Sequence, residues 1–201
     1  MTDPAAGPAA GPAAGPAAGS APERLPLFRQ TVRDDWIDYN GHLSEAYYVL
    51  VFGFATDALM DAAGLDAGYR DRSGCSLYTV EAHVRYLYEV ARDSQLAVRT
   101  VVLGVDAKKI RFLHEMYVCD PASGEPAGDA VATEELFALH VDQGAGRAAE
   151  LPEATRERLT RLAGPAPEWA GRGIREVRGG ATLKADRRNS PPGIHHGEAR
   201  P

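Results

Sequence analysis

Residues 38–53 read DYNGHLSEAYYVLVFG and open a long, almost wholly apolar segment that spans residues 44–63. Apolar residues surround the first half of this segment, a pattern typical of a helix that is buried on all sides. The second half has a polar face, and Gly64 suits the position just after a helix. The sequence therefore predicts a buried helix whose start carries a carboxylate, a glycine and an imidazole, from Asp38, Gly41 and His42.

The start of a helix has a chemistry of its own. Its first backbone N–H groups are unpaired, and the helix dipole adds a partial positive charge there. A carboxylate beside such donors can act on a carbonyl whose oxygen becomes negative during the reaction. The motif thus favours acyl transfer or thioester hydrolysis.

Most of the remaining sequence is typical of β-strands. Alternating or β-rich runs, separated by turn sequences, occur at 27–32, 75–90, 96–103, 110–119 and 130–141. Residues 151–163 predict a closing amphipathic helix. Because the last four β runs follow one another, we expect them to pair as an antiparallel meander.

One helix and one sheet bury each other economically when the sheet curves around the helix. We therefore expect an α+β chain with the hotdog fold, in which about five antiparallel strands wrap a long central helix. The outer face and the edges of such a sheet need cover. A homodimer joined edge to edge, or a homotetramer, would supply it.

Composition divides the chain into one domain and two tails. Residues 5–16 are three copies of Ala-Ala-Gly-Pro, which can form neither a helix nor a core. We expect residues 1–24 to be disordered and not a signal peptide, because they lack a basic start and a leucine-rich run. The Gly-, Pro- and Arg-rich residues 164–201 also read as disordered. That leaves residues 25–163 as a single domain.

Charge and cysteine content exclude several classes of partner. The net charge of −6 argues against a nucleic-acid-binding body. No apolar run reaches the roughly 20 residues that span a bilayer, so we expect no membrane partner. Cys75 and Cys119 are far apart and fit a reduced, cytoplasmic setting. Neither metal-ligand spacing nor a phosphate- or dinucleotide-binding glycine motif occurs, so we predict no cofactor and no metal.

The motif and several longer phrases carry a family resemblance. Asp38, Gly41 and His42 before an aromatic-rich helix resemble the 4-hydroxybenzoyl-CoA-type acyl-CoA thioesterases of the hotdog superfamily. A narrower resemblance, to betainyl-CoA thioesterases of bacterial carnitine breakdown, covers about residues 27–151. It rests on DYNGHLSEAYYVLVFG, ATDAL, YTVEAHVRYL, DAKKIRFLHEM and LHVDQGAGRAA. The resemblance implies an acyl-CoA substrate, betainyl-CoA in the narrower case.

The resemblance also implies roles for the motif residues. Asp38 takes the place of the family's catalytic carboxylate, as a nucleophile or as a general base. Gly41 permits close backbone approach, and the N–H groups near His42 and Leu43 could hold the thioester oxygen. His42 either positions the loop or bonds the substrate. A simpler reading of Asp38 is a turn-forming aspartate.

A second polar group lies on the run at 75–90. Alternation places Glu81, His83 and Arg85 on one face, opposite Tyr78, Val80 and Ala82. Such a row faces water, a partner subunit or the site, because burial without partners is costly. We assign Glu81 to the catalytic group and His83 to substrate binding, with a paired network at a subunit contact as the alternative.

The remaining substrate contacts are assigned by proximity and charge. Asn40, Ser44 and Tyr47 accompany the motif, although many relatives carry Asn where this chain has Ser44, and serine caps a helix about as well. Aromatic rings near the motif could contact a quaternary ammonium, or could simply be core. Lys108, in a turn, could meet the CoA phosphates.

Other functions stay open at this point. The same fold could hydrolyse other short-chain or aromatic acyl-CoA esters. It could also bind CoA esters without turning them over, or support hydratase chemistry. The last needs a histidine in a glycine- and proline-rich loop, which we do not find.

Overall fold

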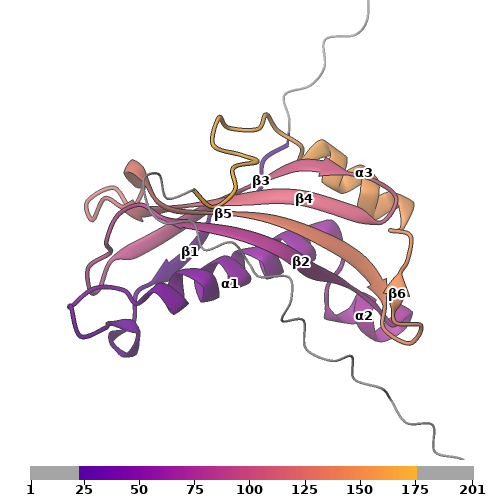
Figure 1. Cartoon of the computed structure of the whole chain (residues 1–201), viewed down its shortest axis with the longest axis horizontal. Helices are drawn as coiled ribbons and strands as arrows, with labels where there is room; N and C mark the ends of the chain where they lie inside the picture. The colour runs from indigo at the N-terminus through magenta and orange to yellow at the C-terminus, as the bar shows by residue number, and fades with distance from the viewer. Residues whose placement is uncertain (1–22, 176–201) are drawn as a thin grey trace, which may run out of the picture.

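The computed structural model describes residues 23–175. Within them the strands are β1 (Phe28–Thr31), β2 (Cys75–Tyr86), β3 (Gln95–Val105), β4 (Lys109–Cys119), β5 (Pro126–Asp142) and β6 (Arg147–Ala148). The helices are the 3₁₀ turn η1 (Asp34–Trp36), α1 (Glu45–Ala63), α2 (Ala67–Ser73) and α3 (Glu153–Arg161). The sheet curves along α1, which confirms the α+β class and the expected arrangement (Figure 1).

Helix α1 has the predicted position and ends. Ser44 is its N-terminal cap residue and has an extended backbone, although the serine hydroxyl makes no capping bond. Gly64 ends the helix at a φ of +80°, a conformation that favours glycine, and its N–H donates to the Asp61 carbonyl. The short helix α2 and strand β6, which the sequence did not predict, follow as local additions.

The sheet order corrects the predicted meander. The strands are arranged β1-β3-β4-β5-β2, with β6 paired to β5. Of the four strands predicted to form the meander, β3, β4 and β5 pair in chain order and β2 does not. Residues 87–94 cannot form a hairpin because they cross the end of the sheet. There, Leu87 and Tyr88 donate to the Val131 carbonyl, and the Val90 carbonyl accepts from Leu43. Among the described residues, this crossing leaves β2 at the edge of the sheet, with β5 as its one neighbouring strand.

The core lies between α1 and one face of the sheet. The first half of α1 packs on β3, β4 and β5 in one buried cluster, and the second half joins α3 in another. Phe52 and Phe112, both fully buried, belong to the first and second cluster respectively. Burial of this apolar area is the main term that stabilises the fold.

We had expected the first half of α1 to be buried on all sides, and this prediction is wrong. Val49 and Leu50 are 41% and 39% exposed, so one side of the helix is open in a single chain. With 19 residues and a mean hydropathy of 1.2, α1 is also long and apolar enough to cross a membrane by composition alone, contrary to our expectation. Its buried face against the sheet is that of a core helix.

Strand β2 carries a bulge that changes the predicted alternation. Thr79 pairs with Ala138 and Glu81 pairs with Phe137, so Val80 is an extra residue between them. After the bulge, Glu81 and His83 share the outer face of the sheet and Ala82 lies on the inner face, in agreement with the predicted alternation. Before the bulge the pattern shifts by one residue, so Tyr78 shares the outer face with Glu81, whereas we had expected it on the face of Ala82.

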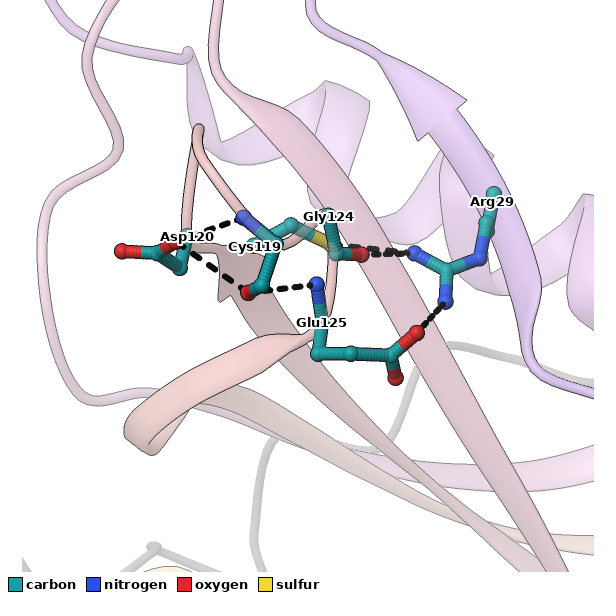
Figure 2. Close-up of polar contacts among 6 residues, drawn as sticks. Arg29, Cys119, Asp120, Gly124 and Glu125 are labelled. Carbon is teal, nitrogen blue, oxygen red and sulfur yellow. Dashed lines mark hydrogen bonds and ion pairs between the residues drawn. The ribbon is translucent and has the colours of Figure 1, made fainter.

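Arg29 of β1, the edge strand at the other end of the sheet from β2, binds the turn between β4 and β5 (Figure 2). Its guanidinium donates to the Gly124 carbonyl and lies 3.3 Å from the Glu125 carboxylate. The turn is closed by its own bonds, in which Asp120 N–H donates to the Glu125 carbonyl at 2.8 Å. Because Arg29 and Glu125 are largely exposed, the ion pair adds little stability.

The chain beyond residue 163, which we expected to be disordered, is described as far as residue 175. Gly164 N–H donates to the Val102 carbonyl at 2.9 Å, and Gly171 N–H donates to the Glu135 carboxylate at 2.6 Å. This segment therefore contacts β3 and the outer face of β5. Residues 1–22 and 176–201, the rest of the two predicted tails, lie outside the described residues.

Replacing Phe52 with alanine should test the dependence of the fold on α1. We expect Phe52→Ala to lower the free energy of unfolding by about 3–5 kcal/mol, because it removes a fully buried ring and leaves a cavity. Urea unfolding followed by circular dichroism measures the change. Val49→Ala, on the exposed side of the same helix, should cost about 1 kcal/mol or less, and equal losses in the two variants would contradict the packing described here.

Candidate active site

The loop at 38–42 is a tight turn held by its own backbone. Asp38 N–H donates to the His42 carbonyl at 2.9 Å, and Gly41 N–H donates to the Asp38 carbonyl at 3.0 Å. Gly41 has a φ of +84°, which side chains rarely adopt. The glycine of the motif is thus required by the turn, and the turn fixes where Asp38 and His42 lie.

The Asp38 carboxylate is oriented by the same loop. Its Oδ1 accepts from the N–H of Asn40 at 2.8 Å and, more weakly, from the N–H of His42 at 3.4 Å. Within residues 23–175, Oδ2 has no such partner. These contacts alone would suit a structural aspartate. What sets Asp38 apart is the pocket beside it.

A pocket of about 340 Å³ opens next to the loop. Asp38, Asn40 and His42 line it from the loop, Glu45 and Tyr48 from the first turns of α1, and residues 86–89 from the end of β2 and the chain that follows. The predicted motif residues are therefore brought together at one cavity, at the start of a helix. Such a pocket suits the reacting end of a substrate.

The donors that we expected for the thioester oxygen are partly occupied. Leu43 N–H donates to the Val90 carbonyl at 2.9 Å, and His42 N–H faces Asp38. The prediction is wrong for Leu43, because a residue 47 positions later in the chain takes its N–H. In the first turn of α1, the Tyr47 N–H donates to the Ser44 carbonyl at 3.0 Å. The donor that remains at the pocket is the N–H of Glu45, at the start of the helix, where backbone N–H groups lack the acceptor that a preceding turn would supply.

His42 and Tyr48 shape the electrostatics of the pocket. His42 Nε2 lies 3.5 Å from the Glu89 carboxylate, and Tyr48 donates its hydroxyl to the Tyr88 carbonyl at 3.2 Å. Burial raises the pKa of the Tyr48 hydroxyl, and the carboxylates of Glu89 and Asp38 raise it further. Tyr48 is therefore a neutral wall of the pocket.

Glu81 and His83 lie elsewhere. They line a second cavity of about 370 Å³ on the outer face of the sheet, together with Arg111, Glu135 and residues 171–173. Arg111 forms an ion pair with Glu135 there. Within one chain, neither Glu81 nor His83 lines the Asp38 pocket, so their assignment to the site stays a prediction.

Lys108 and Tyr47 also lie away from the pocket. Lys108 is in the turn that precedes β4, at the opposite end of this 11-residue strand from the motif, a span of roughly 30 Å. Tyr47 stacks on Trp36 with ring centroids 5.3 Å apart, as part of the packing under the loop. Tyr48, one position later, is the ring that lines the pocket.

Comparison with known proteins places the chain in a family. Residues 32–159 match the thioesterase-like superfamily. This chain belongs to the thioesterase-like superfamily. The match covers the motif loop, α1 and the strands β2–β5, so the resemblance read from the motif and the phrases is confirmed.

Two curated relatives within this superfamily are similar over most of the chain. The betainyl-CoA thioesterase of Pseudomonas aeruginosa is 41% identical over 155 residues, which are 75% of this chain and 94% of that protein. The L-carnitine dehydrogenase/betainyl-CoA thioesterase of Agrobacterium fabrum is 44% identical over 158 residues. These cover 77% of this chain but only 31% of that longer, two-function protein.

Two solved structures agree with the fold. A thioesterase candidate from Pseudomonas putida KT2440 is 37% identical, with a TM-score of 0.63, and the match covers 77% of this chain and 98% of that one. A Staphylococcus aureus protein solved in complex with CoA has a TM-score of 0.70 at 22% identity, over 80% of this chain and all of that one. The second similarity supports the fold alone.

Sequence reasoning missed several residues at the thioesterase-like pocket, including Tyr86, Tyr88 and Glu89. Tyr86, the last residue of β2, and Tyr88, two residues beyond it, are 47% and 57% exposed, an unusual state for two rings close to a core helix. The sequence did show that Val84, Tyr86 and Tyr88 are two residues apart, as residues on one face of a strand are. What was not visible is that the chain after β2 returns to the motif loop.

A buried polar row crosses the inner face of the sheet, near the pocket. Thr100, His114 and Glu134 lie side by side on β3, β4 and β5. His114 is fully buried, and burial lowers its pKa to about 3, so the imidazole is neutral. Glu134 is 4% exposed, and burial raises the pKa of its carboxyl to about 7.

Replacing Glu134 should change how stability depends on pH. The pKa of the folded state exceeds the usual value of 4.5, so the folded chain holds this proton more tightly and loses stability as the pH rises from about 4.5 to 7. Glu134→Gln removes the titrating group. We expect the stability of the variant relative to wild type to rise by about 3 kcal/mol between pH 4.5 and 8.

Urea unfolding at several pH values measures this difference. The groups that face Glu134 are the neutral His114 on β4 and Tyr86 on β2, and neither titrates in that range in the folded chain. A stability difference between variant and wild type that does not change with pH would contradict the buried state of Glu134.

Proposed function

We propose that this protein is a cytoplasmic thioesterase that hydrolyses a short, cationic acyl-CoA, betainyl-CoA, to betaine and CoA. One observation carries the proposal. The oriented Asp38 lies at a pocket beside the start of α1, in a chain 41% identical to a betainyl-CoA thioesterase over 94% of that protein. The free thiols of Cys75 and Cys119 suit the reducing cytoplasm.

Asp38 supplies the chemistry along one of two routes. As a nucleophile, its Oδ2 attacks the thioester carbonyl, CoA leaves as the thiolate, and water then cleaves the acyl-aspartyl anhydride. As a general base, it takes a proton from water, which attacks the carbonyl directly. In both routes the backbone N–H groups of Asn40 and His42 hold Oδ1 of Asp38, so its Oδ2 is free to meet the substrate or the water.

The developing oxyanion needs donors that are not already bonded. The N–H group of Glu45, at the start of α1, meets this need, and the helix dipole reinforces it. His42, paired with Glu89, forms the side of the pocket and positions the loop. If Glu81, His83 or Lys108 contacts the substrate at the Asp38 pocket, that residue would belong to a second copy of the chain.

We propose a homodimer formed through β2. Within residues 23–175 this strand has β5 on one side and no strand on the other. Exposed apolar side chains occur along β2 and just after it, at Tyr78, Val80, Tyr86, Leu87 and Tyr88, and Val49 and Leu50 of α1 are exposed as well. An edge of this kind would pair with another strand. Edge-to-edge pairing would cover the open side of α1 and part of the Asp38 pocket.

Replacing Asp38 with asparagine should abolish hydrolysis and retain binding. In Asp38→Asn the side-chain amide oxygen can still accept the Asn40 and His42 N–H groups, so the loop persists, but the amide is neither nucleophile nor base. We expect kcat/KM to fall at least about 100-fold, measured as thiol release from betainyl-CoA with a chromogenic thiol reagent. Asp35→Asn, on the exposed turn η1, serves as the control, and turnover within threefold of wild type for Asp38→Asn would sink the mechanism.

The same assay separates the possible substrates. Release from aromatic or neutral short-chain esters alone would keep the enzyme class and remove the betainyl assignment. Binding of CoA esters without release from any of them would indicate a binding module instead.

A charge on the β2 edge should prevent dimer formation. Val80 is 54% exposed in the bulge, so lysine there is tolerated by the monomer but repels its copy in the paired edge. We expect Val80→Lys to sediment as a monomer where wild type sediments as a dimer. Thr31→Lys, on the opposite edge strand β1, is the matched control, and a Val80→Lys variant that stays dimeric would refute this interface.

A further inference from the structure

Glu134 has no partner in the part of the chain that the structure describes. Its carboxylate makes no hydrogen bond or ion pair with residues 23–175, although it is 4% exposed. Its neighbour His114 cannot help, because Thr56 and Thr100 hydroxyls occupy both imidazole nitrogens at 2.9 Å. A buried carboxylate without a partner is costly, so its retention needs a reason.

The space next to Glu134 is open on the side of β2. Glu134 pairs with Val84, and the adjacent inner-face residue Ala82 is exposed although it faces the helix side of the sheet. On α1, Gly53 lies one turn before Thr56, and a Cβ at Gly53 would meet nothing within 4 Å. The missing side chain of Gly53 and the small methyl group of Ala82 leave room on this side of the carboxylate.

Tyr86 links this space to the Asp38 pocket. It pairs with Ala132, two residues before Glu134, so Tyr86 and Glu134 are diagonal neighbours on the inner face, roughly 7–8 Å apart. The Tyr86 ring packs edge-to-face on Tyr48, with centroids 5.4 Å apart, and both rings line the pocket. Aromatic faces next to a carboxylate are the surroundings that a quaternary ammonium prefers.

We propose that Glu134, with the Tyr86 ring, is the counter-charge that selects a cationic acyl group at the Asp38 pocket. The inference rests on the proposed function and adds the residue that recognises the substrate's charge. The ammonium of a betainyl group is one carbon away from the thioester carbonyl, so it enters the pocket with the reacting atoms. A neutral ester of the same shape gains nothing from the carboxylate.

Direct contact is not required for a large effect. Opposite unit charges about 8 Å apart, at an effective dielectric constant of about 20, attract enough to change kcat/KM roughly 30-fold. The bound cation also offsets the cost of burying Glu134. The site is therefore least stable when empty and ionised.

The test compares two esters of equal shape, betainyl-CoA and 3,3-dimethylbutanoyl-CoA, in which carbon replaces the ammonium nitrogen. Wild type should favour the cationic ester. Glu134→Gln should lose roughly 30-fold in kcat/KM on betainyl-CoA and stay within about twofold on the neutral ester. Asp129→Asn, an exposed carboxylate on the same strand, is the control and should change neither.

Each other outcome is decisive. An equal loss on both esters would overturn the selection of charge by Glu134, because the effect would not depend on the ammonium. A changed oligomeric state would place Glu134 at a contact between copies instead, and no loss on either ester would refute any role. If wild type hydrolyses neither ester, the proposed function fails, and calorimetry with the thioethers S-(2-trimethylammonioethyl)-CoA and S-(3,3-dimethylbutyl)-CoA decides on Glu134. Cation-selective binding that Glu134→Gln abolishes would uphold it, and equal affinities would overturn it.

Discussion

The packing of α1 against one face of a single curved sheet constrains the rest of the molecule. One sheet can cover only one side of a helix, so the fold buries Phe52 and leaves Val49 and Leu50 in solvent. Within residues 23–175 the same geometry ends the sheet at the edge strand β2. The chain that follows β2 then returns to the start of α1, where its bond to Leu43 fixes the motif loop. The site is thus a consequence of how the helix is covered.

Two kinds of polar group depend on this arrangement. Asp38 stands at the rim, where its loop holds one oxygen and a pocket adjoins the other. Glu134 lies deeper, on the inner face of the sheet, where burial disfavours the charged form of its carboxyl group. A rim carboxylate can react because it is near solvent, whereas a buried one can select, because a charge in low dielectric acts strongly on its neighbours. We propose that the chain uses one of each.

The sequence predicted features that depend on near neighbours. Helix α1 and strands β2–β5 follow from local periodicity, and Asp38, Asn40 and His42 meet at one pocket because they are within five residues of one another. Features set by distant pairing were missed. The place of β2 beside β5, the bulge at Val80 and the use of the Leu43 N–H by Val90 all depend on contacts between remote parts of the chain.

The same distinction explains which site residues were misplaced. Tyr47 and Tyr48 are equivalent in sequence, and only the helix phase relative to the sheet decides that Tyr48 faces the pocket while Tyr47 stacks on Trp36. No sequence motif marks Glu134, and a carboxylate in a strand is usually expected to face water. Its register with His114 and Val84 turns it inward instead. An inward carboxylate that meets no cation of residues 23–175 is best understood through a cation that comes from outside, and Tyr86, its diagonal neighbour on β2, also lines the Asp38 pocket.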